Sequence, residues 1–225
     1  EVGDINTGRK GAGEAGTSTA SIIFGGNDPS NDTDSVESWD GSSWTEIADM
    51  NTARRELAGA GTSTAALGFG GNQGPGSVTE SWNGTSWTEV ADLGTARYGL
   101  AGAGTSTAAI AFGGGPGTKN VTETWNGSAW TEVADLNTAR RNIAGATSGT
   151  TSSTIGFGGT NPTRALTEDW NGSAWTEVAD LNTAVHNHGG VGTVTAALSF
   201  GGDGPTTATE EWTAPTKSTV TFDLS

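Results

Sequence analysis

A repeat with a period of 43 to 45 residues runs through the whole chain and constrains its fold more than any other feature. Paired glycines mark the same point in each copy, at residues 25–26, 70–71, 113–114, 158–159 and 201–202. A Glu-x-Trp triplet follows each pair, and its Trp is Trp39, Trp82, Trp125, Trp170 or Trp212. A period in the forties with several short strands is typical of a propeller blade, so five copies predict five blades.

Each copy can be divided into four short strands joined by tight turns. In the second copy these are residues 54–61, 65–69, 78–82 and 87–90. The last turn contains Asn-Gly or Asp-Gly in four copies, which is the strongest short hairpin signal. The same four copies carry a second Trp five residues after the first, namely Trp44, Trp87, Trp130 and Trp175. The two Trp of a copy should therefore face each other across the hairpin.

The chain is thus predicted to be all-β, a single domain over residues 1–225 that forms a five-bladed β-propeller. Each blade is a four-stranded antiparallel meander, with blades at residues 5–49, 50–92, 93–135, 136–180 and 181–225. Small residues suit the first strands, which converge on the axis. The second strands end in Phe24, Phe69, Phe112, Phe157 and Phe200, which we expect in the core. Residues 219–224 are expected to supply the last outer strand.

Composition narrows the possible partners. The formal net charge is -15 and only ten residues are Lys or Arg, which argues against binding to nucleic acid. No cysteine is present for a disulfide or a thiolate metal site, and we expect no cofactor. No apolar stretch is long enough to insert into a membrane. Because the chain opens Glu-Val-Gly-Asp, we expect it to be a domain of something longer.

The repeat resembles the kelch repeat, with an Arg that opens the inner strand, a hydrophobic strand that closes in Gly-Gly, an aromatic residue on the third strand and Trp on the fourth. It departs from that pattern in having Trp where Tyr is common, and in having five copies where six or seven are commoner. The amino-acid sequence of residues 121–140 is also similar to kelch-like repeats in tail-fibre and structural proteins of marine phages. This resemblance implies a virion or extracellular setting.

The copies agree so well in their framework that any binding site should lie where they differ. They differ most between Gly-Gly and Glu-x-Trp, in the loops that join the second and third strands. In a propeller these loops ring one mouth of the central channel, where function often concentrates. The predicted ligand-binding residues are Asn27, Asp28, Asp32, Asp34, Gln73, Lys119, Asn120, Asn161, Arg164 and Asp203.

Two further groups of charged or titratable residues admit both a structural and a functional reading. Arg9, Arg54, Arg97 and Arg140 recur near Asp4, Asp49, Asp92 and Asp135, and we expect these opposite charges to lock neighbouring blades. His186 and His188 occupy alternate positions of the fifth inner strand, as a two-ligand metal site would require. No third ligand is evident, so we expect no metal.

The leading functional hypothesis is a non-enzymatic propeller module of a larger extracellular or virion fibre. It would recognise a cell-surface carbohydrate or protein through one loop face, or serve as a spacer. The alternatives are a glycan-active hydrolase or lyase on a propeller scaffold, and a self-assembling structural subunit that forms homo-oligomers or fibres. The fold alone supports none of these over the others. No residue stands out from the repeat as catalytic.

Overall fold

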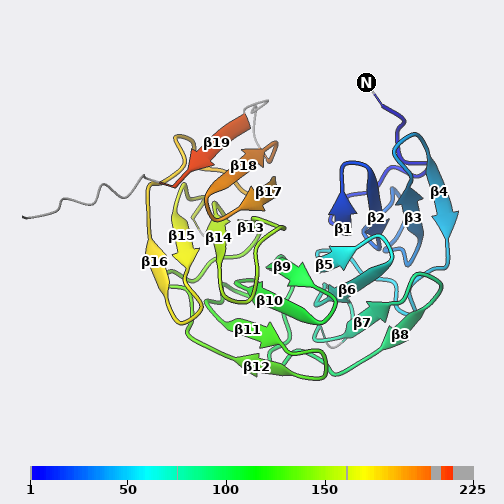
Figure 1. Ribbon diagram of the computed structural model, residues 1–225, viewed down its shortest axis with the longest axis horizontal. Coiled ribbons are helices and arrows are strands. Elements are labelled where there is room, and N and C mark those ends of the chain that lie inside the picture. The colour runs from blue at the N-terminus through cyan, green and yellow to red at the C-terminus, as the bar shows by residue number, and fades with distance from the viewer. Residues whose placement is uncertain (1, 75, 161, 204–208, 215–225) are drawn as a thin grey trace, which may run out of the picture.

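The computed structural model describes residues 2–74, 76–160, 162–203 and 209–214, and in these ranges it is an all-β propeller. Five antiparallel sheets, the blades, stand around a common axis in the order of the sequence (Figure 1). The described ranges contain no helix, so none of them could cross a membrane by one. The predicted fold class is therefore confirmed.

The strands are short, and each blade uses them in sequence order. Blade 1 contains β1 (Gly13–Thr17), β2 (Ala20–Phe24), β3 (Val36–Trp39) and β4 (Trp44–Ile47). Blade 2 contains β5 (Ala58–Thr62), β6 (Ala65–Phe69), β7 (Thr79–Trp82) and β8 (Trp87–Glu89). Blade 3 contains β9 (Ala101–Thr105), β10 (Ala108–Phe112), β11 (Thr122–Trp125) and β12 (Trp130–Glu132).

Blade 4 contains β13 (Ala144–Gly145), β14 (Thr154–Phe157), β15 (Thr167–Trp170) and β16 (Trp175–Glu177). The described part of blade 5 contains β17 (Gly189–Thr193), β18 (Ala196–Phe200) and β19 (Thr209–Thr213). The last outer strand that we predict, residues 219–224, lies outside the described residues. In the four blades with two Trp, these residues pair across the outer hairpin with ring centroids 5.5 Å apart, as the repeat predicts.

Neighbouring blades pack through a Phe that enters a notch in the next blade. The ring of Phe69 lies 4.9 Å from that of Trp130, and the equivalent contacts of Phe24 and Phe112 measure 5.0 and 4.8 Å. The floor of the notch is glycine because nothing larger fits. A Cβ built on Gly102 would lie 2.5 Å from Cζ of Phe69, closer than any real contact. The glycine of the inner strand thus sets how closely two blades approach.

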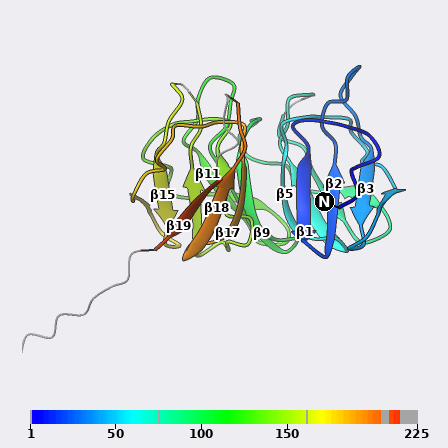
Figure 2. The same ribbon diagram turned by 90° about the horizontal axis from the view of Figure 1, so that it is seen from above.

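The ring of blades is open between blade 5 and blade 1, as two perpendicular views show (Figures 1 and 2). The prediction that all five repeat Phe residues are core is therefore wrong for one of them. Phe24, Phe69, Phe112 and Phe157 are at most 1% exposed, whereas Phe200 is 40% exposed. Leu198 on the same strand is 39% exposed, against 1% or less for its equivalents such as Leu67. Among the described residues, no further blade covers this face.

The repeated Arg residues are buried, but their partner is not the Asp that we predicted. The guanidinium of Arg97 lies 2.9 Å from the carboxylate of Glu123, the Glu of the Glu-x-Trp triplet, and Asp92 instead accepts a hydrogen bond from the backbone of Thr79. The same pairing joins Arg9 to Glu37, Arg54 to Glu80 and Arg140 to Glu168. The strands of the blade bring this distant Glu next to the linker. The nearby Asp instead accepts from the first residue of the third strand of the preceding blade, as Asp92 does from Thr79 in β7.

Phe112 and Phe200 are equivalent in sequence and differ only in whether a blade covers them. We expect Phe112→Ala to lower the free energy of unfolding by about 3–5 kcal/mol, because it leaves a cavity between two blades. Phe200→Ala should lower it by only about 1 kcal/mol, since the ring already contacts water. Urea unfolding followed by Trp fluorescence measures both. Equal losses would mean that Phe200 is covered in solution.

Candidate functional site

The loops on one face of the ring surround a polar mouth. This loop face is formed by the loops that join the second and third strands and by the linkers between blades, and it includes nine of the ten predicted site residues. The tenth, Asn161, lies outside the described residues. A cavity of about 770 Å³ opens here. The segments that lead into all five inner strands line it, and its polar side chains are Lys10, Glu14, Asn27, Arg55, Glu56, Asn142, Asn187, His188 and Asp203.

A belt of backbone hydrogen bonds crosses the mouth from blade to blade. Glu56 N–H donates to Gly11 O at 2.6 Å, Gly99 N–H to Glu56 O at 2.8 Å, and Asn142 N–H to Gly99 O at 2.6 Å. Asn187 N–H extends the belt to Asn142 O at 3.3 Å. All five residues have left-handed backbone, with φ between 52° and 64°. Glycine and Asn adopt this conformation readily, so the belt explains their presence at the mouth.

The residue just before each belt residue faces the rim, and its type varies between the blades. These five rim residues are Lys10, Arg55, Tyr98, Arg141 and His186. The side chains of the repeated residues Arg9, Arg54, Arg97 and Arg140 are buried. The remaining Lys and Arg among the described residues are Lys119 and Arg164, and both belong to loops of the same face. In the part of this strongly acidic chain that the structure describes, the accessible Lys and Arg side chains therefore lie on one face.

On the side of blades 1 and 2, the rim is occupied by an internal network. Asp32 accepts from Arg55 Nη1 and Gln73 Nε2, both at 2.6 Å, and from Asn27 Nδ2 at 3.0 Å. Burial alone would raise the pKa of Asp32, but these three hydrogen bonds outweigh it and leave the pKa below its ordinary value. The predicted residues Asn27, Asp32 and Gln73 thus come together, and they satisfy one another and Arg55.

The other predicted residues have different environments. Asp28 accepts from the backbone of Ser30 and Asn31, and these hydrogen bonds lower its pKa. Asp34 and Asn120 contribute backbone carbonyls that accept from the linker that follows. Asp203 lies 3.5 Å from His186 and is mostly exposed. These residues stabilise loops, and only Asp203 among them lines the cavity.

On the side of blades 3 and 4, the rim carries cations that have no acidic partner among the described residues. The Arg141 guanidinium donates to the Tyr98 hydroxyl at 3.3 Å, and its Nε is buried without a hydrogen-bond partner. Arg164 Nε is likewise buried and unsatisfied. Lys119 and Arg164 occupy matching places, since the backbone N–H of each donates to the second glycine of its own Gly-Gly pair. We call Tyr98, Lys119, Arg141 and Arg164 the basic cluster.

From the sequence we placed the site only in the loops between the second and third strands, and so did not identify Tyr98, Arg141 or the belt. A signal for them existed in the sequence, because the position after the repeated Arg varies between the copies while the Arg itself is present in four of the five. The argument that function lies where the copies differ applied to this position as well as to the loops. It was missed because these residues were assigned to the interior of the first strand.

The two histidines do not form the predicted pair on one strand. β17 begins at Gly189, after both of them, and Asn187 between them has φ of 52°, so the alternation of a strand does not apply. His188 is partly buried, with its ring 5.7 Å from that of Phe157, and both of its ring nitrogens are buried and lack a partner. Among the described residues, no group of three or more His, Asp or Glu side chains could hold a metal ion.

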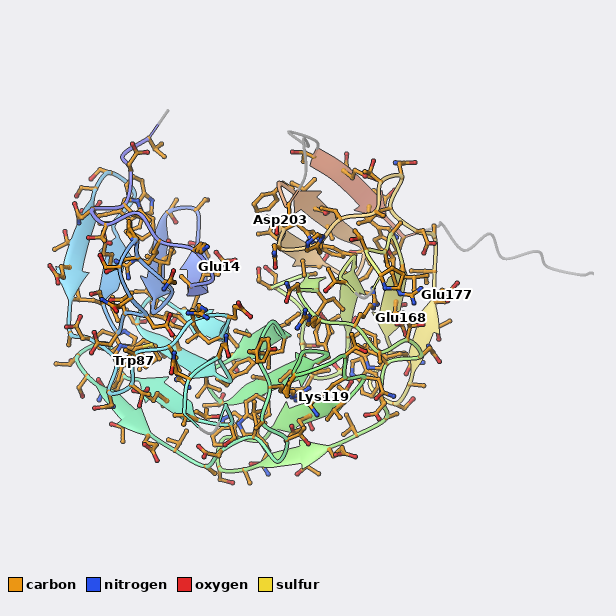
Figure 3. All side chains as sticks on the ribbon, turned by 180° about the vertical axis from the view of Figure 1, so that it is seen from behind. Glu14, Trp87, Lys119, Glu168, Glu177 and Asp203 are labelled. Atoms are coloured by element: carbon orange, nitrogen blue, oxygen red, sulfur yellow. The ribbon has the colours of Figure 1, made fainter. Side chains whose placement is uncertain are left out.

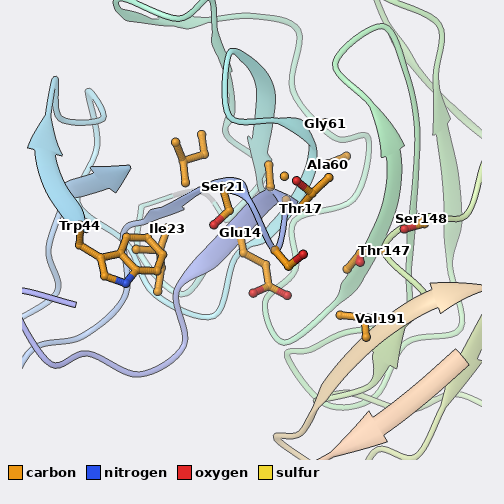
Figure 4. Close-up of a pocket in the computed structure, with 15 residues that line it drawn as sticks. Glu14, Thr17, Ser21, Ile23, Trp44, Ala60, Gly61, Thr147, Ser148 and Val191 are labelled. Atoms are coloured by element: carbon orange, nitrogen blue, oxygen red, sulfur yellow. The ribbon is translucent and has the colours of Figure 1, made fainter. Parts of the chain in front are cut away.

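A second cavity, of about 580 Å³, lies where the ring is open (Figure 4). Trp44, Ile23, Glu14 and Thr17 of blade 1 face Ser148 and Val191 across it. Glu14 and Asp203 lie on opposite sides of the opening (Figure 3). Glu14 is accessible to water, yet the walls partly desolvate its carboxylate and raise its pKa. We call this space the seam cavity.

The sequence matches no protein-family model and no curated protein. The functional argument therefore depends on the geometry and charge of the loop face.

His188 stands where blades 2 to 4 carry Leu57, Leu100 and Ile143. Burial lowers its pKa from 6.5 to about 4, with smaller effects from nearby positive charge, so the unfolded chain binds a proton that the folded chain does not. This histidine therefore costs stability as the pH falls from about 6.5 towards 4. We expect His188→Leu to raise the free energy of unfolding by about 1–3 kcal/mol at pH 7, because two unsatisfied nitrogens are removed.

The gain from His188→Leu should widen at pH 5. Urea unfolding of both proteins at pH 7 and pH 5 measures it. A gain that is the same at both values would show that His188 is protonated in the folded protein.

Proposed function

We propose that the protein is a non-enzymatic binding module whose loop face recognises a saccharide that bears an acidic group. One observation carries this proposal. The guanidinium groups of Arg141 and Arg164 are partly accessible and have no acidic partner among the described residues, in a chain with a net charge of -15. Positive charge that the fold itself does not neutralise is available for a ligand.

The chemistry of the cluster fits a carboxylate or sulfate on a polar ligand. A guanidinium binds such groups through paired N–H donors, and hydrogen bonds to charged groups are about twice as strong as neutral ones. Tyr98 adds an aromatic ring and a hydroxyl beside Arg141. The neighbouring cavity, with its Asn, Arg and Glu side chains, offers donors and acceptors for sugar hydroxyls.

The rigidity of the rim also supports binding. The belt fixes the backbone on the axial side of the rim residues, so little conformational entropy would be lost when a ligand binds. Together with the resemblance of the repeat to tail-fibre proteins, this favours a receptor-binding role on a virion or extracellular fibre. A protein ligand with an exposed acidic group is the second candidate, because the basic cluster would serve it equally.

Binding of the folded chain to an array of neutral, carboxylated and sulfated glycans tests the proposal. We expect acidic glycans to bind and Arg141→Ala to weaken binding by about 10- to 100-fold, the loss of one charge-assisted interaction. Glu177→Gln is the matched control, since Glu177 lies on the outer edge of the ring (Figure 3) and should leave binding unchanged.

Three results would count against this account in different ways. Binding of neutral glycans alone, unaffected by Arg141→Ala, would reject the acidic group and keep a saccharide. A gain in binding with Glu177→Gln as large as the loss with Arg141→Ala would show that overall charge, and not the basic cluster, determines binding. Absence of binding to every glycan would favour a protein ligand or a spacer role.

A further inference from the structure

The open face of blade 5 has the same residues with which blades 2 to 4 contact the blade that follows them. In blades 1 to 4, the second strand ends in a Phe that is covered by the next blade. Two positions before it lies a buried Ile or Leu. Across the sheet from the Phe lies a Thr in blades 2 to 4 and Val36 in blade 1. Thr79 and Thr122 accept hydrogen bonds from Trp130 and Trp175 of the following blade, at 3.1 and 3.0 Å.

Blade 5 has the same three features, and all of them face open space. Leu198 and Phe200 are 39% and 40% exposed, and Thr209, which pairs with Phe200 across the sheet, is also exposed. These are two of only three large hydrophobic residues that are exposed in the described chain. The face therefore has the chemistry of a blade interface without its second half.

Blade 1 lacks the notch that would complete this interface. The notch is a cross-strand pair of small residues on the first two strands, such as Gly59 with Gly68, or Gly145 with Gly156. A Cβ on any of these four glycines would lie 2.9 Å or less from the Phe of the preceding blade. In blade 1 the corresponding pair is Glu14 with Ile23, whose side chains occupy the space that a Phe ring needs.

Blades 1 and 5 are thus not complementary in the way that their neighbours are. Close-packed apolar layers tolerate little added volume, and a charged carboxylate against a Phe ring would lose its water without gaining a partner. Glu14 and Ile23 instead give blade 1 the polar, filled outer face of a terminal repeat. They line the seam cavity and face away from blade 2 (Figure 4).

We propose that the Leu198–Phe200 face is a docking surface for one further blade of this same repeat. The docked blade carries small residues at the two notch positions, as blades 2 to 5 do. The argument is continuity with the four blade interfaces already present. In each of them, the blade that contributes the Phe uses the same positions of its second strand. The proposal is independent of ligand binding at the loop face.

The test is a six-blade variant, in which residues 1–212 are followed by a second copy of residues 171–225. Trp170 and Trp212 are equivalent in the repeat, so the junction preserves the period. The added blade brings the same notch, Gly190 with Ser199, that receives Phe157 in the parent chain. Phe200→Ser is then made in the parent and at the original Phe200 of the six-blade variant.

We expect Phe200→Ser to lower the urea midpoint only slightly in the parent. In the six-blade variant it should lower the midpoint about as much as Phe157→Ser does. Equal, small shifts in both chains would overturn the proposal, because the added blade would not cover Phe200. A large shift in the parent that depends on protein concentration would show that a second copy of the chain covers this face, which also overturns it.

A large, concentration-independent shift in the parent would mean that blade 5 closes directly onto blade 1. The control variant Glu14→Gly/Ile23→Gly gives blade 1 the glycine notch of blades 2 and 4. It tests whether these two side chains keep blade 5 from packing on blade 1. Under our proposal, Phe200→Ser becomes more damaging in that background than in the parent, because only the filled notch prevents closure. An unchanged shift there would contradict the role that we assign to Glu14 and Ile23.

Discussion

The buried pair of Arg and Glu is the interaction on which the blade architecture depends. In blade 3, the Arg97 guanidinium donates to the carbonyl oxygens of Gly113 and Val121 as well as to Glu123, and the other carboxylate oxygen of Glu123 accepts from Gly94 N–H at 2.7 Å. The pair therefore fixes the linker from blade 2 against the second and third strands of blade 3. Two charges removed from water are tolerated because each finds several partners.

This framework separates stability from recognition. The linker that the pair anchors continues directly into the rim residue and the belt, so Arg97 is followed by Tyr98 and Gly99, and Arg140 by Arg141 and Asn142. The constant residue is buried, and the variable residue beside it faces the mouth. A new specificity can then be obtained by changing the rim without disturbing the pair, which is the common arrangement of binding residues on a rigid scaffold.

Most of the fold was predictable because the repeat encodes it five times. The Gly-Gly period, the Trp hairpins and the strand order all followed from spacing and turn chemistry. The partner of Arg97 did not, because Asp92 is five residues away in sequence while Glu123 reaches it only through the packing of three strands. The His186 and His188 prediction failed because the left-handed Asn187 precedes the strand.

The candidate site was only partly predictable. Asn27, Asp32 and Gln73 do meet on the loop face, yet they satisfy one another and Arg55, and the unpartnered charge lies at Arg141, in a position assigned to a strand. The opening of the ring had a signal in the sequence, since Glu14 and Ile23 replace residues that are small in the other blades. The meaning of that replacement depends on the packing of the preceding Phe, which only three-dimensional structure provides.

The most direct test of the central claim is a double-mutant cycle between Arg97 and Glu123, with Arg97→Met, Glu123→Leu and both together, measured by urea unfolding. If the pair fixes the linker as described, each single change should cost about 3–5 kcal/mol, because it leaves a buried charge without its partner. The double variant should then cost no more than either single one. Losses that simply add would contradict the account, since the two side chains would be stabilising the blade independently.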